Sequence, residues 1–286
     1  MRCIGAACLT WLALAAPVLA AGYDDFTAGM TANLRGDYTR AEAAFTAALA
    51  APDLVPAYKP AAYRGRASAY LALDKCSEAL ADVKAFVALR EPDISVIRLR
   101  VWANLCLKNA DAARKDLDDI AKGKLDWDDL WGFARLEWRY GLYEVAAATA
   151  GESYKLADKR EDATAYVLLW QFLNQIRAGK FDAAAAKASL TELKSRGWPR
   201  PVFDLYLGKL TPQKLQEEAS SFWKSKETEQ RCEANFYTAE WHLGQSDTAA
   251  ATPLLLDVAK NCPLEFIERY AAKSELKRLG VPVPEE

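Results

Sequence analysis

The sequence contains only one histidine, His242, in 286 residues. A nucleophile paired with a general base most often relies on histidine, and a lone histidine beside Trp241 on a predicted repeat helix is more typical of a surface or core polar group. The nucleotide-binding patterns G-x-x-x-x-G-K-[ST] and G-x-G-x-x-G are absent, so no nucleotide cofactor is expected. Paired carboxylates for glycoside cleavage stay open, because none of the 39 acidic residues is singled out. We therefore expect a protein that is not an enzyme and needs no cofactor.

The sequence also lacks an excess of charge of either sign. It has 37 Lys and Arg residues against 39 Asp and Glu residues, a net charge of -2. Binding to nucleic acid or to an anionic membrane by bulk electrostatics is therefore not expected. Hydrophobic residues make up 51% of the chain, which is enough to form a large core.

Residues 1–21 have the pattern of a secretory signal peptide. Arg2 precedes an apolar run from Cys3 to Ala16, and small residues end the segment, so we expect cleavage after Ala20 or Ala21. A membrane anchor is the alternative, but the apolar run is too short to span a bilayer comfortably. The sequence predicts an exported protein, most simply in the bacterial periplasm, with no membrane span after cleavage.

The clearest repeated unit runs from Ala61 to Pro92. Apolar and small residues recur at three- and four-residue intervals on both sides of Asp74-Lys75, which predicts two antiparallel helices. Such a hairpin needs stacked neighbours to bury both of its faces. The spacing Y-x3-A-x2-Y, then A-x3-V, then Pro resembles the tetratricopeptide repeat (TPR). The apolar positions are Tyr63, Ala67, Tyr70, Ala79, Val83 and Phe86.

Weaker copies of this unit follow one another, each marked by an alanine in its second helix. The separations between these alanines stay close to the TPR period of about 34 residues. The resemblance implies five TPR-like hairpins over residues 22–195, with Ala188 in the packing stripe of the fifth. The marker alanines are Ala41, Ala79, Ala113, Ala146 and Ala184.

The period breaks after the fifth hairpin. Gly197-Trp198-Pro199-Arg200-Pro201 interrupts continuous helix. We therefore expect an irregular helical insert over residues 196–228. Within it, Thr211 as N-cap and Pro212 in the first turn predict a helix that continues to about Trp223.

Residues 229–280 are predicted to form a last hairpin and a closing helix. Pro253 falls inside the second helix of that hairpin and predicts a kink or a late start. The closing helix should run from Glu265 to Leu279, and residues 281–286 should form a flexible tail that does not pack. The side chains expected to seal the core are Phe266, Tyr270, Leu276 and Leu279.

Four cysteines remain after the leader, an even number suited to disulfides in an oxidising compartment. Of the three pairings that four cysteines allow, only Cys76 with Cys106 and Cys232 with Cys262 fits the repeat geometry simply. A metal site is the alternative, but no C-x-x-C pair is present and only one histidine is available. We expect two disulfides and no metal.

The end of the chain, CEANFYTAEWHLGQSDTAAATPLLLDVAKNCPLEFIERYAAKSELKRLG, has an aromatic-rich first helix and an E-x-x-x-A-x-x-E-L finish. It resembles the C-terminal part of the NlpI type of bacterial envelope TPR protein. The present chain lacks the lipid-attachment cysteine of that type. The resemblance implies an adaptor whose TPR surface brings peptidoglycan hydrolases together with each other or with a protease.

Asp126-Trp127-Asp128-Asp129 could suggest a calcium loop. Its oxygen ligands are too few and the required glycine is missing, so a helix N-cap is the favoured interpretation.

The predicted binding groove is the non-core face of the first helices, which lines the concave side of TPR solenoids. Aligning the hairpins on their marker alanines places arginines and tryptophans there, and these types are the most enriched at binding hot spots. The alternative is that the tryptophans pack between helices and the arginines solvate the surface. The predicted groove residues are Arg64, Ser68, Arg98, Trp102, Trp131, Arg135, Trp138, Arg139, Tyr166 and Arg177.

The sequence thus predicts an all-α, TPR-like α-solenoid of about six helical hairpins with a C-terminal capping helix. The function we expect is an exported scaffold that binds a peptide or protein in the concave groove, in cell-envelope maintenance. The alternative is a factor that binds or hydrolyses glycan or peptidoglycan through the same aromatic groove.

Overall fold

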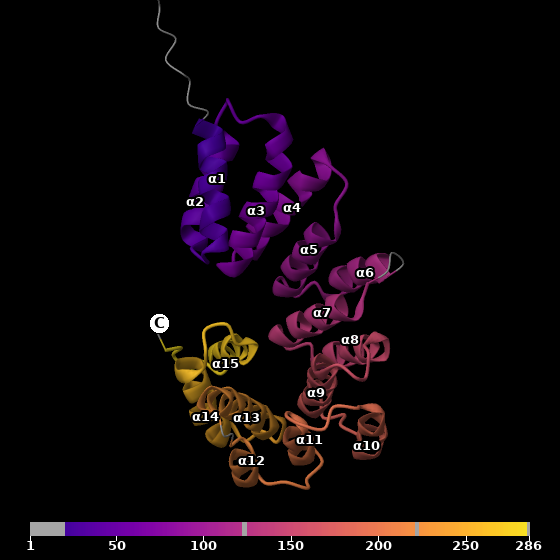
Figure 1. The fold of residues 1–286 in the computed structure, drawn as a ribbon. Coiled ribbons are helices and arrows are strands. Elements are labelled where there is room, and N and C mark those ends of the chain that lie inside the picture. The colour runs from indigo at the N-terminus through magenta and orange to yellow at the C-terminus, as the bar shows by residue number, and fades with distance from the viewer. Residues whose placement is uncertain (1–20, 122–124, 221–222, 285–286) are drawn as a thin grey trace, which may run out of the picture. The chain divides into compact units, whose positions relative to one another are not determined.

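The computed structural model describes residues 21–121, 125–220 and 223–284. Over these residues the chain is all-α, with fifteen α-helices, one short 3-10 helix and no strand (Figure 1). None of the described helices combines the length and apolar character that a membrane span requires. The predicted signal peptide, apart from Ala21, lies outside the described residues and stays a prediction.

The chain divides into two compact units, one ending at Asp116 and the other beginning at Leu117. Within each unit, most consecutive helices pack against one another, which confirms a succession of helical pairs in general. The described part of unit 1 holds α1 (Ala21–Leu34), α2 (Tyr38–Ala50), the 3-10 helix η1 (Pro56–Tyr58), α3 (Lys59–Ala72), α4 (Cys76–Leu89), α5 (Ile94–Cys106) and the first part of α6 (Ala110–Ala121).

Small residues bring the helices of unit 1 into close contact. Phe45 of α2 is 0% exposed and lies between Gly29 of α1 and Gly65 of α3. A Cβ atom at Gly65 would lie 2.3 Å from the Phe45 ring, so the contact requires glycine. The hairpins are therefore held by apolar contacts of the kind that the small-residue pattern predicts.

A repeated ion pair also joins the two helices of successive hairpins in unit 1. Arg66 of α3 donates two hydrogen bonds to Asp82 of α4, at 2.7 and 2.8 Å. One repeat later, Arg100 of α5 donates to Asp116 of α6 at 2.9 and 2.8 Å. Bidentate pairs of this kind fix geometry as well as adding stability, and their recurrence supports the repeat independently of the alanines.

Unit 2 continues with paired helices and ends in a single helix. It holds the rest of α6, then α7 (Trp127–Arg139), α8 (Tyr143–Leu156), α9 (Asp162–Arg177), α10 (Ala183–Glu192), α11 (Arg200–Tyr206), α12 (Pro212–Glu218), α13 (Lys224–Gly244), α14 (Thr248–Asn261) and α15 (Ile267–Arg278). The predicted fifth hairpin is an exception among the helical pairs, because α9 packs against α8, α11 and α13 and makes at most a weak contact with α10. Asp126 caps α7 by accepting a hydrogen bond from the Asp129 backbone, which confirms the N-cap interpretation.

The predicted register of the fifth hairpin is wrong. Ala184 and Ala188 are exposed, and α10 instead buries Ala186 and Leu190. Asp182 caps the helix by accepting hydrogen bonds from Ala184 and Ala185, so α10 begins at Ala183. Its inward face is the one that carries the apolar side chains of Ala186 and Leu190, and this face differs from the one that the period of about 34 residues selects.

Other local predictions near the C-terminus also need correction. The helix capped by Thr211 ends at Glu218 rather than near Trp223. Of the two alternatives for the helix that contains Pro253, the late start is wrong, because Asp247 caps the helix and it begins at Thr248; the kink stays a prediction. In the closing helix, Phe266, Leu276 and Leu279 contact the core as expected, but Tyr270 is 58% exposed.

The first residue of the predicted tail, Val281, packs against the protein. Val281 packs against the core of unit 2, and its backbone N–H donates to the Leu276 carbonyl at 2.9 Å. This contact overturns the expectation that no residue after the closing helix packs.

Both predicted disulfides are present. Cys76 pairs with Cys106 in unit 1, and Cys232 pairs with Cys262 in unit 2, with Cα atoms 6.1 and 5.6 Å apart. Closing a loop of this length stabilises the fold by about 3–4 kcal/mol on a chain-entropy estimate. The two bonds indicate that the protein resides in an oxidising compartment.

Replacing a marker alanine by leucine should destabilise the protein. Ala41, Ala79 and Ala146 are 0% exposed, and overpacking such a site costs about 1–3 kcal/mol. We expect each Ala→Leu variant to lose this much free energy of unfolding in chemical denaturation. Ala184→Leu is the matched control at an exposed position and should change little. Wild-type stability in all four variants would refute the packing of these alanines in the helix contacts.

Candidate functional site

Four of the predicted groove residues lie on the first helices of unit 1, and one of them, Ser68 of α3, is half-buried. Arg64 of α3 is 41% exposed at its side chain and lies 3.8 Å from the Asp93 carboxylate, a long ion pair between exposed groups. On α5, Arg98 is exposed and Trp102 is half-buried. The side chains of this part of the predicted groove are therefore partly accessible.

The corresponding face of α1 is an apolar stripe that the sequence reasoning did not identify. The offsets from the marker alanine that select Arg64 and Ser68 in the second hairpin select Phe26 and Met30 in the first. Tyr23 and Leu34 extend the same side of α1, since spacings of three, four and seven residues share a helical face. Applying the alignment to the first hairpin would have found the stripe.

Several of these apolar side chains are exposed to solvent. Tyr23 is 43%, Met30 37% and Leu34 86% exposed. Tyr58 of η1 packs against the stripe with its ring tilted, and its ring centroid lies 5.2 Å from that of Tyr23 and 5.3 Å from that of Phe26. We call the set Phe26, Met30, Arg64, Ser68, Arg98 and Trp102, with the flanking Tyr23, Leu34 and Tyr58, the first-helix face of unit 1.

In unit 2 the densest part of the predicted groove lies on α7. The Arg135 guanidinium stacks over the Trp131 ring, 4.4 Å from the ring centroid, and Trp131 stacks on Trp127 at 6.2 Å. Burial lowers the pKa of Arg135. This arrangement matches a cation–π pair that is largely removed from water.

Trp138 lies in the hydrophobic core and is 2% exposed. Its ring packs edge-to-face on Trp170 at 5.2 Å and on Phe236 at 6.2 Å. Its neighbour Arg139 is half-buried, and the Arg139 carbonyl accepts a hydrogen bond of 2.7 Å from Arg278 of α15. These contacts come from within unit 2 itself.

Tyr166 of α9 is engaged by a buried carboxylate. Its hydroxyl donates to Glu233 of α13 at 2.9 Å, and the Trp198 indole N–H donates to the same carboxylate oxygen at 2.7 Å. Burial, followed by the charge of Glu268, raises the pKa of Glu233 to about 8. Glu268 in turn accepts a hydrogen bond from the Tyr237 hydroxyl. Two buried carboxylates therefore lie against the predicted groove.

Arg177, the last predicted groove residue, joins three helices. Its guanidinium lies 2.6 Å from Glu240 of α13 and 2.9 Å from Glu275 of α15, and it stacks on the Tyr143 ring of α8 at 4.4 Å. Only 10% of its side chain is exposed. Arg278 also pairs with Glu275 and donates to the Tyr143 hydroxyl. We call these five residues the Arg177 cluster.

Charge in the Arg177 cluster is tightly balanced. Burial disfavours the charged Arg177, but Glu240 and Glu275 outweigh it and raise the pKa of the guanidinium. Burial and the nearby Glu275 raise the pKa of Glu240 to about 7. One oxygen each of Glu240 and Glu275 is buried without a hydrogen-bond partner among the described residues.

The sequence reasoning missed the carboxylates that cover α9. Glu233 and Glu240 are seven residues apart on α13, and Glu268 and Glu275 have the same spacing on α15. Residues seven apart share one helical face, so each helix presents two acids on one side. This seven-residue spacing is visible in the sequence and could have identified the four glutamates as a set. In unit 2, Tyr166 and Arg177 are thus engaged by the chain's own helices.

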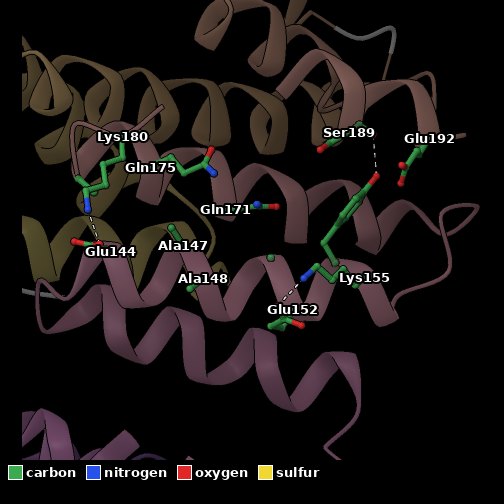
Figure 2. Close-up of a pocket in the computed structure, with 13 residues that line it drawn as sticks. Glu144, Ala147, Ala148, Glu152, Lys155, Gln171, Gln175, Lys180, Ser189 and Glu192 are labelled. Carbon is green, nitrogen blue, oxygen red and sulfur yellow. Dashed lines mark hydrogen bonds and ion pairs between the residues drawn. The ribbon is translucent and has the colours of Figure 1, made fainter. Parts of the chain in front are cut away.

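A pocket of about 520 Å³ opens on another side of unit 2, between α8 and α10, with α9 as its floor (Figure 2). Lys180 and Glu144 form an ion pair of 2.5 Å at one end. At the other end, the Tyr154 hydroxyl of α8 donates to the Ser189 carbonyl of α10 at 2.9 Å. The lining is mostly polar, and it includes Gln171, Gln175, Glu192, Gly151 and Ala147.

In the part of the chain that the structure describes, no group of three His, Cys, Asp or Glu side chains is placed to hold a metal ion. No known protein-family model matches the chain.

Replacing Arg177 by methionine should destabilise the protein strongly. The variant leaves the buried carboxylates of Glu240 and Glu275 without their shared partner, and breaking a buried ion pair from one side costs about 3–5 kcal/mol. Chemical denaturation measures the loss. Arg160→Met is the matched control, since Arg160 pairs with Asp158 at an exposed site, where an ion pair contributes little to stability. Equal losses in the two variants would refute the role of the cluster.

The raised pKa of Glu233 predicts that the free energy of unfolding falls as the pH rises. Its pKa is raised from 4.5 to about 8 on folding, so the folded state binds more protons than the unfolded state between these values. Its contribution to the free energy of unfolding is greatest below the unfolded pKa and is lost as the pH approaches 8. We expect stability to decrease between about pH 5 and 8, and less steeply in Glu233→Gln.

Denaturation of both proteins across this pH range makes the comparison. The glutamine oxygen can still accept the hydrogen bonds from Tyr166 and Trp198, so the local contacts are retained. Identical pH slopes in wild type and Glu233→Gln would show that this carboxyl does not titrate between pH 5 and 8.

Proposed function

We propose that the protein is an exported interaction scaffold of the TPR type that binds a protein partner through the first-helix face of unit 1. The observation that supports the proposal most directly is the exposed apolar stripe of α1, with Tyr23, Met30 and Leu34 open to solvent. The two disulfides fit export to the bacterial periplasm. The succession of helical pairs, with its repeated Arg–Asp pairs, fits a TPR-like solenoid.

The chemistry of this face favours a protein partner. Tyrosine, methionine and arginine are enriched at protein interfaces, and an exposed apolar helix stripe gains stability when a partner covers it. Arg64 adds a partly exposed cation whose ion pair with Asp93 is long at 3.8 Å. The expected partner therefore presents apolar side chains to α1 and a carboxylate to α3.

The corresponding positions of unit 2 support the choice of unit 1. Arg177 and Tyr166 are engaged by Glu275, Glu240 and Glu233 of the same unit. A partner would have to displace these contacts before it could bind there. No such displacement is needed at Tyr23 or Met30.

A second candidate function is binding or hydrolysis of glycan. The observation that favours it is the pair Glu233 and Glu268, because a buried carboxyl with a raised pKa is suited to act as a general acid. Both carboxyls are covered by aromatic side chains, Glu233 by Tyr166 and Trp198. A glycan could reach these carboxyls only if the aromatic side chains moved, whereas a protein partner could bind the first-helix face of unit 1 without such a movement. We therefore favour the interaction scaffold.

The double variant Tyr23→Ala/Met30→Ala should capture its partner from envelope extract at least about tenfold less strongly, because truncating a hot spot costs about 2 kcal/mol or more. Quantitative pull-down measures this. Tyr270→Ala is the matched control, since Tyr270 is an exposed tyrosine of unit 2. Undiminished capture by the double variant would contradict the proposal. Binding of wild type to purified wall material, with no captured protein, would favour the glycan function.

A further inference from the structure

We propose that the pocket between α8 and α10 binds an extended peptide segment that carries a lysine or arginine side chain. This pocket belongs to unit 2 and shares no residue with the first-helix face of unit 1. The two sites are therefore independent proposals, and either can fail alone.

Two side-chain amides without a hydrogen-bond partner among the described residues lie on the floor of the pocket. Gln171 and Gln175 of α9 are half-buried and lie side by side along the floor in Figure 2. Neither side-chain amide makes a hydrogen bond with another described residue. Each amide offers both donors and an acceptor, so each can pair with a peptide N–H and C=O.

The spacing of these amides suits an extended chain. Residues four apart in a helix are separated by about 6 Å along its axis. Two residues of an extended peptide span about 6.6 Å. Gln171 and Gln175 can therefore pair with every second residue of a peptide laid along α9.

Small residues on α8 make room for the peptide backbone. Ala147, Ala148 and Gly151 line the pocket on that side. A Cβ atom at Gly151 would come within 3.1 Å of the Gln171 side-chain nitrogen, so a larger residue there would push the amide from its place. The α8 wall thus leaves both the floor amides and the space above them open.

The charges of the lining favour a cationic side chain. Glu144 pairs with Lys180, and Glu152 pairs with Lys155 at 2.7 Å, so these four charges are internally balanced. Glu192 of α10 makes no hydrogen bond or ion pair with the described residues, and its carboxylate interacts with the Lys159 ammonium only through a longer-range attraction. The position of a direct ion-pair partner is therefore open. A lysine or arginine of the bound peptide would supply its partner.

The wall that bears Glu192 is held in position by α8. Tyr154 spans the end of the pocket and donates to the Ser189 carbonyl, one turn before Glu192. Lys159 lies over the Tyr154 ring, 4.0 Å from the ring centroid. The carboxylate is therefore presented by a helix that is already fixed, which lowers the entropic cost of binding.

A random octapeptide library displayed on phage tests the proposal, because selection from it assumes nothing about the sequence of the natural ligand. Wild-type protein is used for selection, and the enriched clones are then compared on the double variant Gln171→Leu/Gln175→Leu. We expect a family of clones with a fixed lysine or arginine that binds wild type and is lost on the double variant. Gln213→Leu, at an exposed glutamine of α12, is the matched control and should retain these clones.

A synthetic peptide of the enriched sequence is then titrated by fluorescence anisotropy. Two lost hydrogen bonds should weaken binding about tenfold or more in the double variant. Glu192→Gln should weaken it similarly and remove the preference for lysine or arginine. Unchanged melting temperatures show that the variants are folded.

Three results would overturn the proposal. The first is that no clones are enriched, and the second is that every enriched peptide binds the double variant as well as wild type. The third is that purified wall glycan fragments, and no peptides, bind in a manner that depends on Gln171 and Gln175. That result would assign the pocket to glycan instead.

Discussion

The packing of α9 against α13 and α15 in unit 2 depends on the guanidinium of Arg177. Arg177 contacts Glu240 of α13 and Glu275 of α15 at once, and so fixes α9 against both helices. Two buried acids near one cation would be costly without such contacts, because an unpaired charge in the interior loses its hydration. Arg278 adds a second cation to Glu275. The cluster thus couples the position of the last helix to that of the middle of the unit.

These and neighbouring contacts occupy part of the predicted groove in unit 2. α13 and α15 direct their carboxylates toward side chains of α9 that would otherwise be open to a ligand. The two surfaces that we propose for binding are not covered in this way: they are the apolar stripe of α1 in unit 1 and the pocket over α9 in unit 2. The first suits an apolar protein surface, and the second suits an extended, hydrogen-bonding segment.

The local parts of this arrangement could be predicted from the sequence. Alternating small and apolar residues fix the helical pairs, and the positions of Cys76 and Cys106 in neighbouring helices imply their pairing. The contact between Arg177 and Glu275 could not be predicted, because it joins residues 98 apart in sequence. Helical periodicity reports which side of a helix is apolar, not which distant segment covers it. The register error at Ala184 has a similar origin, since α10 buries Ala186 and Leu190 against core residues that lie far away in sequence.

Hydrogen–deuterium exchange of the α15 backbone amides tests the central claim most directly. If the Arg177 cluster holds α15 in place, the amides of Ile267–Arg278 should be about as well protected as those of α9 in wild type. In Arg177→Met they should exchange faster, while α1 to α4 of unit 1 stay unchanged. Rapid exchange of α15 in wild type, or the same protection in both proteins, would contradict the account.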